Sequence, residues 1–125
     1  MQLQSNTVTP VEKLYDLCMI DRLCRGNQDK VKKMVEVFIN TAPQSVEEIK
    51  IAYLQGDFAV VKKVAHRIKP TLSYYAIIKI EKDILQIEKL AKEGLPCTEL
   101  EQKIIKVDEV ISQVIEKMKQ DILHN

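Results

Sequence analysis

Residues 58–75 read FAVVKKVAHRIKPTLSYY, and the spacing of their apolar side chains decides the fold. The apolar positions follow one another in alternating steps of three and four residues: Phe58, Val61, Ala65, Ile68, Leu72 and Tyr75. This spacing gathers apolar side chains on one face of an α-helix, which has about 3.6 residues per turn. The segment is therefore predicted to be an amphipathic helix that buries this face and leaves the opposite face in solvent.

Three further segments of the chain carry the same pattern, with their apolar positions at 31–53, 77–91 and 100–122. Gly56 and Gly94 end two of the four helices, since glycine suits the left-handed residue after a helix. Asp57 is expected to cap the 58–75 helix. Because the connections are short, neighbouring helices should run antiparallel. The sequence thus predicts an all-α fold, an antiparallel up-and-down four-helix bundle with a short additional N-terminal helix.

The N-terminal part of the chain divides into two regions. Residues 1–9 are polar and irregular and are expected to form a flexible segment, which leaves 10–125 as the helical bundle domain. Pro10 is expected to open the short N-terminal helix, with Thr9 as its cap, because proline is favoured in the first turn.

Three further expectations concern the course and the ends of the long helices. Pro43 lies inside an apolar pattern without disturbing its phase, which indicates either one kinked helix or two nearly collinear helices. The third long helix is expected to begin at Ile77, and Thr98 is expected to cap the last one.

Composition and charge narrow the class of protein. The chain has 125 residues, of which 46% are hydrophobic and 30% charged, an ordinary balance for one globular domain. Its net charge of +1 argues against nucleic-acid binding, which needs a concentrated positive field. No apolar run approaches the ~18 residues of a membrane span, and the first residues do not resemble a secretory signal. Three cysteines without a paired framework indicate reduced thiols. We therefore expect a cytoplasmic protein without a membrane partner, and a monomer, since one bundle can bury all four apolar faces.

His66 is the residue in this sequence best suited to take part in a chemical reaction. At about 100° per residue, its side chain points roughly 130° away from the apolar face of its helix. Five neighbours share this outward face: Ala59, Lys62, Lys69, Pro70 and Ser73. Small side chains leave room for a partner, and the lysines would attract a phosphoryl group. The alternative is an ordinary solvent-exposed helix face that carries a histidine by chance.

Other chemistries find little support in the sequence. A metal site requires several ligands at helical spacing, and Lys63 stands where a Glu-x-x-His pair would need its glutamate. No glycine-rich phosphate loop precedes a helix, and no nucleophile–histidine relay can be assembled. We therefore expect no metal and no cofactor bound by this chain.

The segment Ala65-His66-Arg67-Ile68-Lys69-Pro70, followed by Ser73 and Ala76, resembles the signature of the histidine-containing phosphotransfer (HPt) domain. That family reads approximately A-H-x-L-K-G, with small residues about seven and ten positions after the histidine. Residues 21–58 also resemble the family's helix, proline and Gly-Asp turn, so the similarity spans roughly residues 11–94. Two positions depart from the pattern, because Pro70 and Ala76 stand where the family usually has glycine.

The resemblance implies a phosphorelay intermediate without kinase activity of its own. His66 would accept a phosphoryl group from the aspartyl phosphate of one receiver domain and pass it to the aspartate of another. The implied partners are the receiver domain of a response regulator and a hybrid sensor histidine kinase, and the receiver supplies the Mg²⁺. Lys69 matches the family's lysine, which assists charge neutralisation. The outward face predicts that the receiver touches Ala59, Lys62, Pro70 and Ser73.

The family often carries Gln or Glu about 22 positions after the histidine, where it bonds the histidine Nδ1, and this position is Glu88. Glu88 also falls inside the apolar arc of its own helix, near Ile84 and Ile87, where a carboxylate needs a polar partner or must reach the rim. Two readings of Glu88 thus stay open, a bond to His66 and a simple rim position.

A second function class is a helical adaptor related to HPt domains, which binds a receiver or kinase without being phosphorylated. A degenerate copy of the domain usually loses the histidine, the lysine or both, whereas His66 and Lys69 are both present. The sequence therefore favours phosphotransfer.

Overall fold

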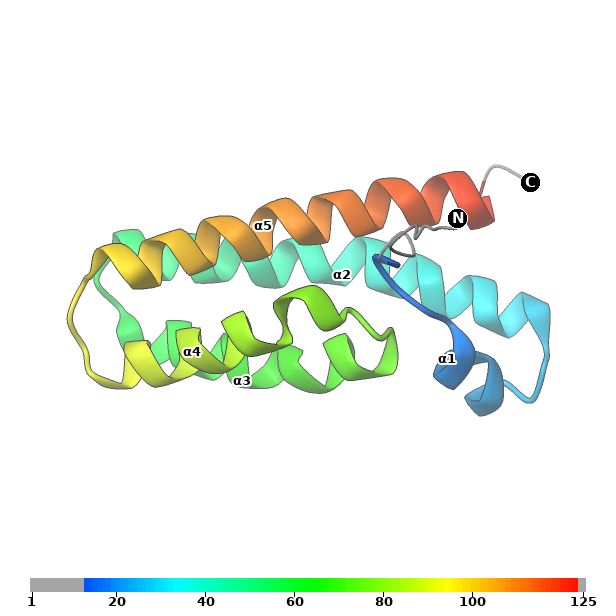
Figure 1. Cartoon of the computed structure of the whole chain (residues 1–125), viewed down its shortest axis with the longest axis horizontal. Helices are drawn as coiled ribbons and strands as arrows, with labels where there is room; N and C mark the ends of the chain where they lie inside the picture. Colours follow the sequence, from blue (N-terminus) through cyan, green and yellow to red (C-terminus); the bar gives the residue numbers. More distant parts are fainter. Residues whose placement is uncertain (1–12, 124–125) are drawn as a thin grey trace, which may run out of the picture.

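Four long helices pack side by side in antiparallel order in the computed structural model, which describes residues 13–123 (Figure 1). The α-helices are α1 (Cys18–Leu23), α2 (Gln28–Leu54), α3 (Phe58–Tyr74), α4 (Glu81–Lys92) and α5 (Thr98–Met118). A 3₁₀ turn, η1 (Ile78–Ile80), precedes α4, and a π-helical turn, η2 (Lys119–Leu123), follows α5. No strand occurs within 13–123, and the all-α prediction is confirmed.

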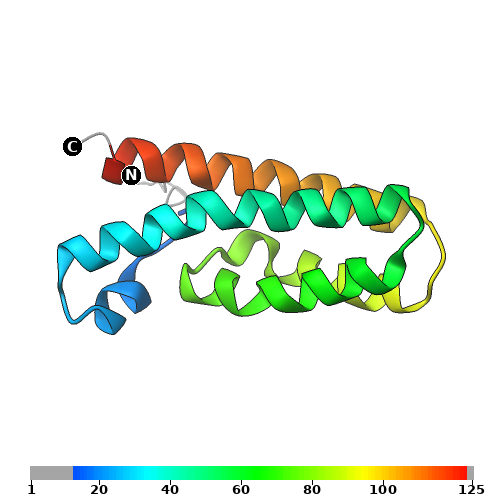
Figure 2. The same ribbon diagram turned by 180° about the vertical axis from the view of Figure 1, so that it is seen from behind.

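Each long helix packs against two neighbours, α2 and α4 both lying against α3 and α5. The views from front and back show that α2 and α5 extend beyond the shorter α3–α4 pair, and that α1 lies at this end against α2 (Figures 1 and 2). The four-helix bundle with a short additional N-terminal helix is thus the observed architecture.

Most of the buried core consists of residues that the apolar spacing predicts, although Val64 and Val110 are buried as well and Phe58 is only partly buried. In α3 the core positions Val61, Ala65, Ile68 and Leu72 are at most 3% exposed. Full burial of a side chain the size of Leu or Ile stabilises a fold by about 1.5–3 kcal/mol. The apolar face therefore fixes the rotation of α3 about its own axis, and with it the direction of every polar side chain on that helix.

Side-chain caps begin three of the helices. Asp57 Oδ1 accepts a hydrogen bond from the Val60 N–H at 3.2 Å, as predicted, and Asn27 does the same for Lys30 at the start of α2. The prediction for α5 is wrong, because Thr98 is the first helical residue and the cap is Cys97, whose Sγ accepts from Leu100 N–H at 3.4 Å. Sulfur is a weak acceptor, which is why sequence rules favour the neighbouring hydroxyl.

The predicted start of the N-terminal helix is also wrong where the structure tests it. Thr9 and Pro10 lie outside the described residues, but 13–17 is not helical and α1 begins only at Cys18. The Asp16 carboxylate accepts from Cys18 N–H at 2.7 Å, and Asp16 N–H donates to the Tyr75 carbonyl at 2.9 Å. This contact with the end of α3 ties down a non-helical segment that helical spacing alone does not reveal.

Both internal prolines are accommodated within continuous helices. Pro43 lies inside α2 and Pro70 inside α3, so the single-helix alternative for α2 is the one observed. Proline has no N–H, so the carbonyl four residues earlier, that of His66 in the case of Pro70, loses its helical donor. The packing of the two apolar faces offsets these losses.

The turn between α3 and α4 is closed by a residue in a left-handed conformation. Ala76 has φ +51°, its N–H donates to the Ser73 carbonyl at 3.1 Å, and Ile77 N–H donates to the Leu72 carbonyl at 2.9 Å. This bonding pattern is the helix end that normally uses glycine. The 3₁₀ turn η1 follows, so α4 begins at Glu81 rather than at the predicted Ile77.

We predict that Ala76→Gly stabilises the protein by about 0.5–1 kcal/mol. The Cβ strain of a left-handed residue costs about 1–2 kcal/mol, and the greater freedom of glycine in the unfolded chain returns part of that gain. Urea unfolding measures the change. Ala52→Gly, in regular helix of α2, should instead lower stability by about 1 kcal/mol or more. Destabilisation by Ala76→Gly contradicts the strain described for this turn.

Candidate functional site around His66

His66 projects from the outer face of α3. Its side chain is 69% exposed, although its chain neighbour Ala65 is fully buried. The direction predicted from the helical spacing is thus observed. An exposed imidazole on a helix whose rotation is fixed by the core presents its ring at a defined place on the surface.

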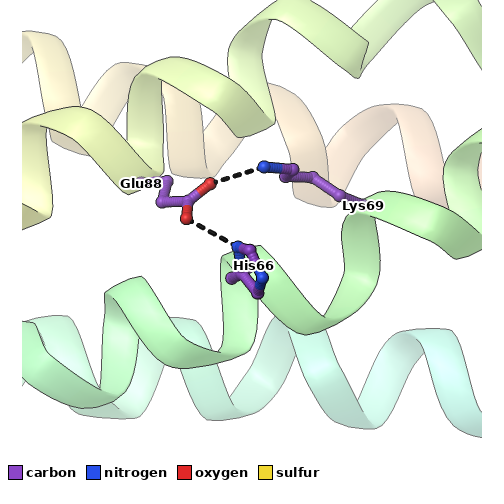
Figure 3. A network of polar contacts seen from close by, with 3 residues as sticks. All are labelled: His66, Lys69 and Glu88. Carbon is purple, nitrogen blue, oxygen red and sulfur yellow. Dashed lines mark hydrogen bonds and ion pairs between the residues drawn. The ribbon is translucent and has the colours of Figure 1, made fainter.

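The closest partner of His66 comes from α4. Its Nδ1 lies 2.8 Å from Oε2 of Glu88, and Lys69 donates from Nζ to the other oxygen, Oε1, at 3.0 Å (Figure 3). The Glu88 side chain is 20% exposed and that of Lys69 33%. The carboxylate is therefore shared between two side chains of α3, and of the two readings left open by the sequence, the bond to His66 is the one present.

The charge of Glu88 follows from these contacts. The hydrogen bond from Lys69 lowers the pKa of the Glu88 carboxyl, desolvation opposes this, and the bond with His66 lowers it further. Glu88 is consequently a carboxylate at neutral pH, and a carboxylate only accepts hydrogen bonds. The proton between the two residues must then reside on Nδ1, which leaves the lone pair on Nε2.

Two shallow hollows flank the imidazole. One, of about 380 Å³, runs between α3 and α4 and is lined by His66, Lys69, Pro70, Leu72, Ser73, Glu81, Ile84 and Leu85. The other, of about 530 Å³, lies towards the start of α3 and is lined by Ala59, Lys62, Lys63, His66 and Glu88. The four residues expected to touch a partner are all exposed and divide between these hollows, with Pro70 and Ser73 in the first and Ala59 and Lys62 in the second.

Sequence reasoning identified Glu88 on α4 but missed the other α4 residues that line this surface. Leu85, which is 52% exposed, and Glu81 form the far wall of the first hollow. The helical spacing places Leu85 at the edge of the apolar arc of α4, which is a signal for a half-covered position. It cannot show that this edge lies beside Pro70 and Ser73, because that depends on how α3 and α4 pack.

A second charged group on α4 serves the fold. Asp83 is 6% exposed and lies between α4 and α5, where Lys106 Nζ and Lys103 Nζ are 3.0 and 3.4 Å from its carboxylate oxygens. A buried carboxylate requires such partners, and both come from α5. Within 13–123 no three His, Cys, Asp or Glu side chains are grouped to hold a metal ion, and no helix is long and apolar enough to cross a membrane.

The architecture matches that of a domain of known structure. The chain is similar to the crystal structure of the HPT domain from the Hpt sensor hybrid histidine kinase from Shewanella, with a TM-score of 0.70 and 19% sequence identity. The match covers 88% of this chain and 94% of the other. No family model matches the sequence, and no curated protein matches it. The chain has the fold of an HPt domain, and the resemblance seen around Ala65–Pro70 is confirmed at that level.

We predict that Lys69→Met raises the pKa of Glu88 towards its ordinary value, because the main cause of the lowering is removed. A lowered pKa means that the Glu88 contacts stabilise the folded protein at neutral pH and are lost as the pH falls through the folded-state value. Titration of the Glu88 carboxyl carbon by NMR measures the shift. Lys32→Met, at an exposed position of α2, is the control and should leave Glu88 unchanged. An unaltered Glu88 titration in Lys69→Met contradicts the ion pair.

Proposed function

We propose that this protein is a phosphorelay intermediate, which accepts a phosphoryl group on His66 from a receiver-domain aspartate and passes it to another receiver domain. The observation that carries the proposal is the exposed imidazole whose Nδ1 is bonded to a carboxylate, so that Nε2 faces solvent with its lone pair free. The HPt fold supports the same function.

The transfer step requires no external base, because the attacking nitrogen already has a free lone pair. The Nε2 lone pair attacks the phosphorus of the aspartyl phosphate, the bond from phosphorus to the carboxyl oxygen breaks, and the aspartate leaves as a carboxylate. The Nδ1 proton stays in place, so positive charge develops on the ring. Glu88 lies 2.8 Å from that nitrogen and offsets this charge as it forms.

Charges around the imidazole suit a phosphoryl group. Lys69 lies one turn beyond His66 and Lys62 one turn before it on α3, so both carry positive charge near the imidazole, with Lys69 paired to Glu88. In this proposal the protein has no kinase activity of its own and binds no cofactor. The Mg²⁺ that activates an aspartyl phosphate belongs to the receiver domain.

The proposed docking surface consists of the two hollows beside His66. A receiver seated there contacts Ala59 and Lys62 on one side and Pro70, Ser73 and the apolar side chain of Leu85 on the other. A hybrid sensor histidine kinase and a response regulator supply the two receivers. The protein acts in this relay as a cytoplasmic monomer.

We expect His66→Gln to abolish phosphoryl transfer while the fold remains intact, because the replaced side chain is largely exposed. The measurement is incubation with a phosphorylated receiver domain, followed by detection of acid-labile, alkali-stable label. His124→Gln is the matched control and should keep the label. If the wild-type protein binds the receiver but never takes up label, the adaptor function replaces this proposal, and label on His66→Gln contradicts the assignment of the residue.

Ser73→Trp is expected to block transfer from the receiver without impairing His66 itself. The large ring would fill the hollow between α3 and α4, where Ser73 is exposed. Phosphorylation by phosphoramidate, a donor too small to need docking, should continue at the wild-type rate. Ser112→Trp, on the exposed face of α5, should leave both reactions unchanged. Equal loss with both donors would show damage to the site and would refute the docking surface.

A further inference from the structure

A third hollow lies beside α1, outside the two that flank the imidazole. It has a volume of about 410 Å³, and its walls come from the segment before α1, from α1, from the end of α3 and from the start of η1. Its lining includes Asp16, Met19, Arg22, Ser73, Ala76 and Ile78. Figure 1 shows α1 beyond the α3–α4 turn, alongside the part of α2 that this shorter helix pair leaves uncovered.

We propose that this hollow is a second contact surface for the docked receiver domain, and that Ile78 and Arg22 favour a receiver that presents a carboxylate beside an apolar side chain. The inference rests on the proposed function, because it takes the receiver as the protein that docks over His66. It adds a surface formed by α1 and η1 to the docking surface on α3 and α4.

The hollow exposes apolar surface that the core does not use. Ile78 is 70% exposed and Met19 is 46% exposed, and both line the hollow together with Ala76. Single apolar side chains on a surface need no explanation, but apolar side chains that gather in a hollow mark an interaction site. The neighbour of Ile78 in the chain, Ile77, is fully buried, so the core fixes the place at which Ile78 is presented.

The charged groups around this hollow are unequally paired. Lys13 Nζ lies 3.4 Å from the Asp16 carboxylate, so these two groups neutralise each other. Arg22 lines the same hollow, and within residues 13–123 its guanidinium has no carboxylate partner. A guanidinium pairs well with a carboxylate, because two parallel N–H donors match the two oxygens. The partner that fits this hollow therefore carries a carboxylate next to an apolar group.

The third hollow is continuous with the docking surface around His66. Ser73 lines both this hollow and the one between α3 and α4. It lies seven residues beyond His66, which is about 10 Å along the helix axis at 1.5 Å per residue. A standard protein interface buries about 800 Å² on each partner, a patch about 16 Å in radius. A protein seated over His66 therefore reaches the third hollow, whereas the phosphoryl group that it carries does not.

The wall formed by α1 is already in place before a partner arrives. Asp16 N–H donates to the Tyr75 carbonyl at 2.9 Å, and the Asp16 carboxylate accepts from Cys18 N–H at 2.7 Å. One residue earlier, Tyr15 Oη donates to Asp121 Oδ2 at 2.7 Å. These bonds connect the segment before α1 with the end of α3 and with η2. A preformed surface loses little conformational freedom on binding, which favours its use as an interface.

The test measures receiver binding and the chemistry of His66 separately. The probe is the receiver domain that labels the wild-type protein fastest, chosen from a panel of purified receiver domains. Ile78→Ser should raise its Kd about tenfold, because an apolar side chain is no longer buried in the complex. Arg22→Glu should raise the Kd about three- to tenfold, with a smaller effect at high salt. Phosphoramidate should label both variants at the wild-type rate, since neither residue lies beside the imidazole.

Two matched controls place the same changes elsewhere on the surface. Ile105→Ser, at a 52% exposed position of α5, and Lys32→Glu, at an exposed position of α2, should leave the Kd unchanged. A rescue experiment tests the expected carboxylate directly. The exposed carboxylates of the receiver are replaced by lysine one at a time, and one of these receivers should bind Arg22→Glu more tightly than it binds the wild-type protein.

The possible results separate this inference from the proposed function. Wild-type affinity of the receiver for both Ile78→Ser and Arg22→Glu overturns the second contact surface and leaves the role of His66 intact. A wild-type dimer that Ile78→Ser converts to a monomer in sedimentation also overturns it, because the hollow would then be a contact between two copies of this chain. If no receiver of the panel binds or labels the wild-type protein, the proposed function fails and this inference fails with it.

Discussion

The packing of α3 against α4 is the constraint on which the site depends. His66 and Glu88 are 22 residues apart, on two antiparallel helices joined by the turn at Ala76 and Ile77. A shift of one residue in α4 would rotate the Glu88 side chain by about 100° and remove it from the imidazole. Ala76, the left-handed residue of this turn, has a strained backbone conformation. The strain is tolerated because this turn sets the register of α3 and α4. The apolar faces maintain that register along their whole length.

Ion pairs and hydrogen bonds connect α4 with both of its neighbours, α3 and α5. Asp83 binds two lysines of α5, and Glu88 binds Lys69 and His66 of α3, so these two carboxylates of α4 contact both neighbouring helices. The two groups differ in exposure and in consequence. Asp83 is buried and its loss would leave two lysines without their partner, whereas Glu88 reaches the surface and acts on a ring in solvent. One carboxylate of α4 is thus buried against α5, and another bonds the exposed imidazole of α3.

Much of the fold was predictable because the features that determine it lie close together in the sequence. Apolar spacing identified the four helices, Asp57 was recognisable as a cap, and the direction of His66 followed from helix geometry. The remaining features arise from contacts between distant residues. The second donor on Glu88, the wall formed by Leu85 and the start of α1 all depend on which faces meet after the helices pack. Resemblance to a family indicated the Glu88 contact, which periodicity alone left open.

The central claim is that Nε2 of His66 is the atom that takes the phosphoryl group, because Glu88 holds the proton on Nδ1. Phosphorylation of ¹⁵N-histidine-labelled protein by a phosphorylated receiver, followed by ³¹P and ¹⁵N NMR, identifies the nitrogen bonded to phosphorus. The account predicts a single phosphohistidine, with the P–N bond at Nε2 of His66 and a proton retained on Nδ1. A P–N bond at Nδ1, or phosphorylation at any other residue, would contradict it.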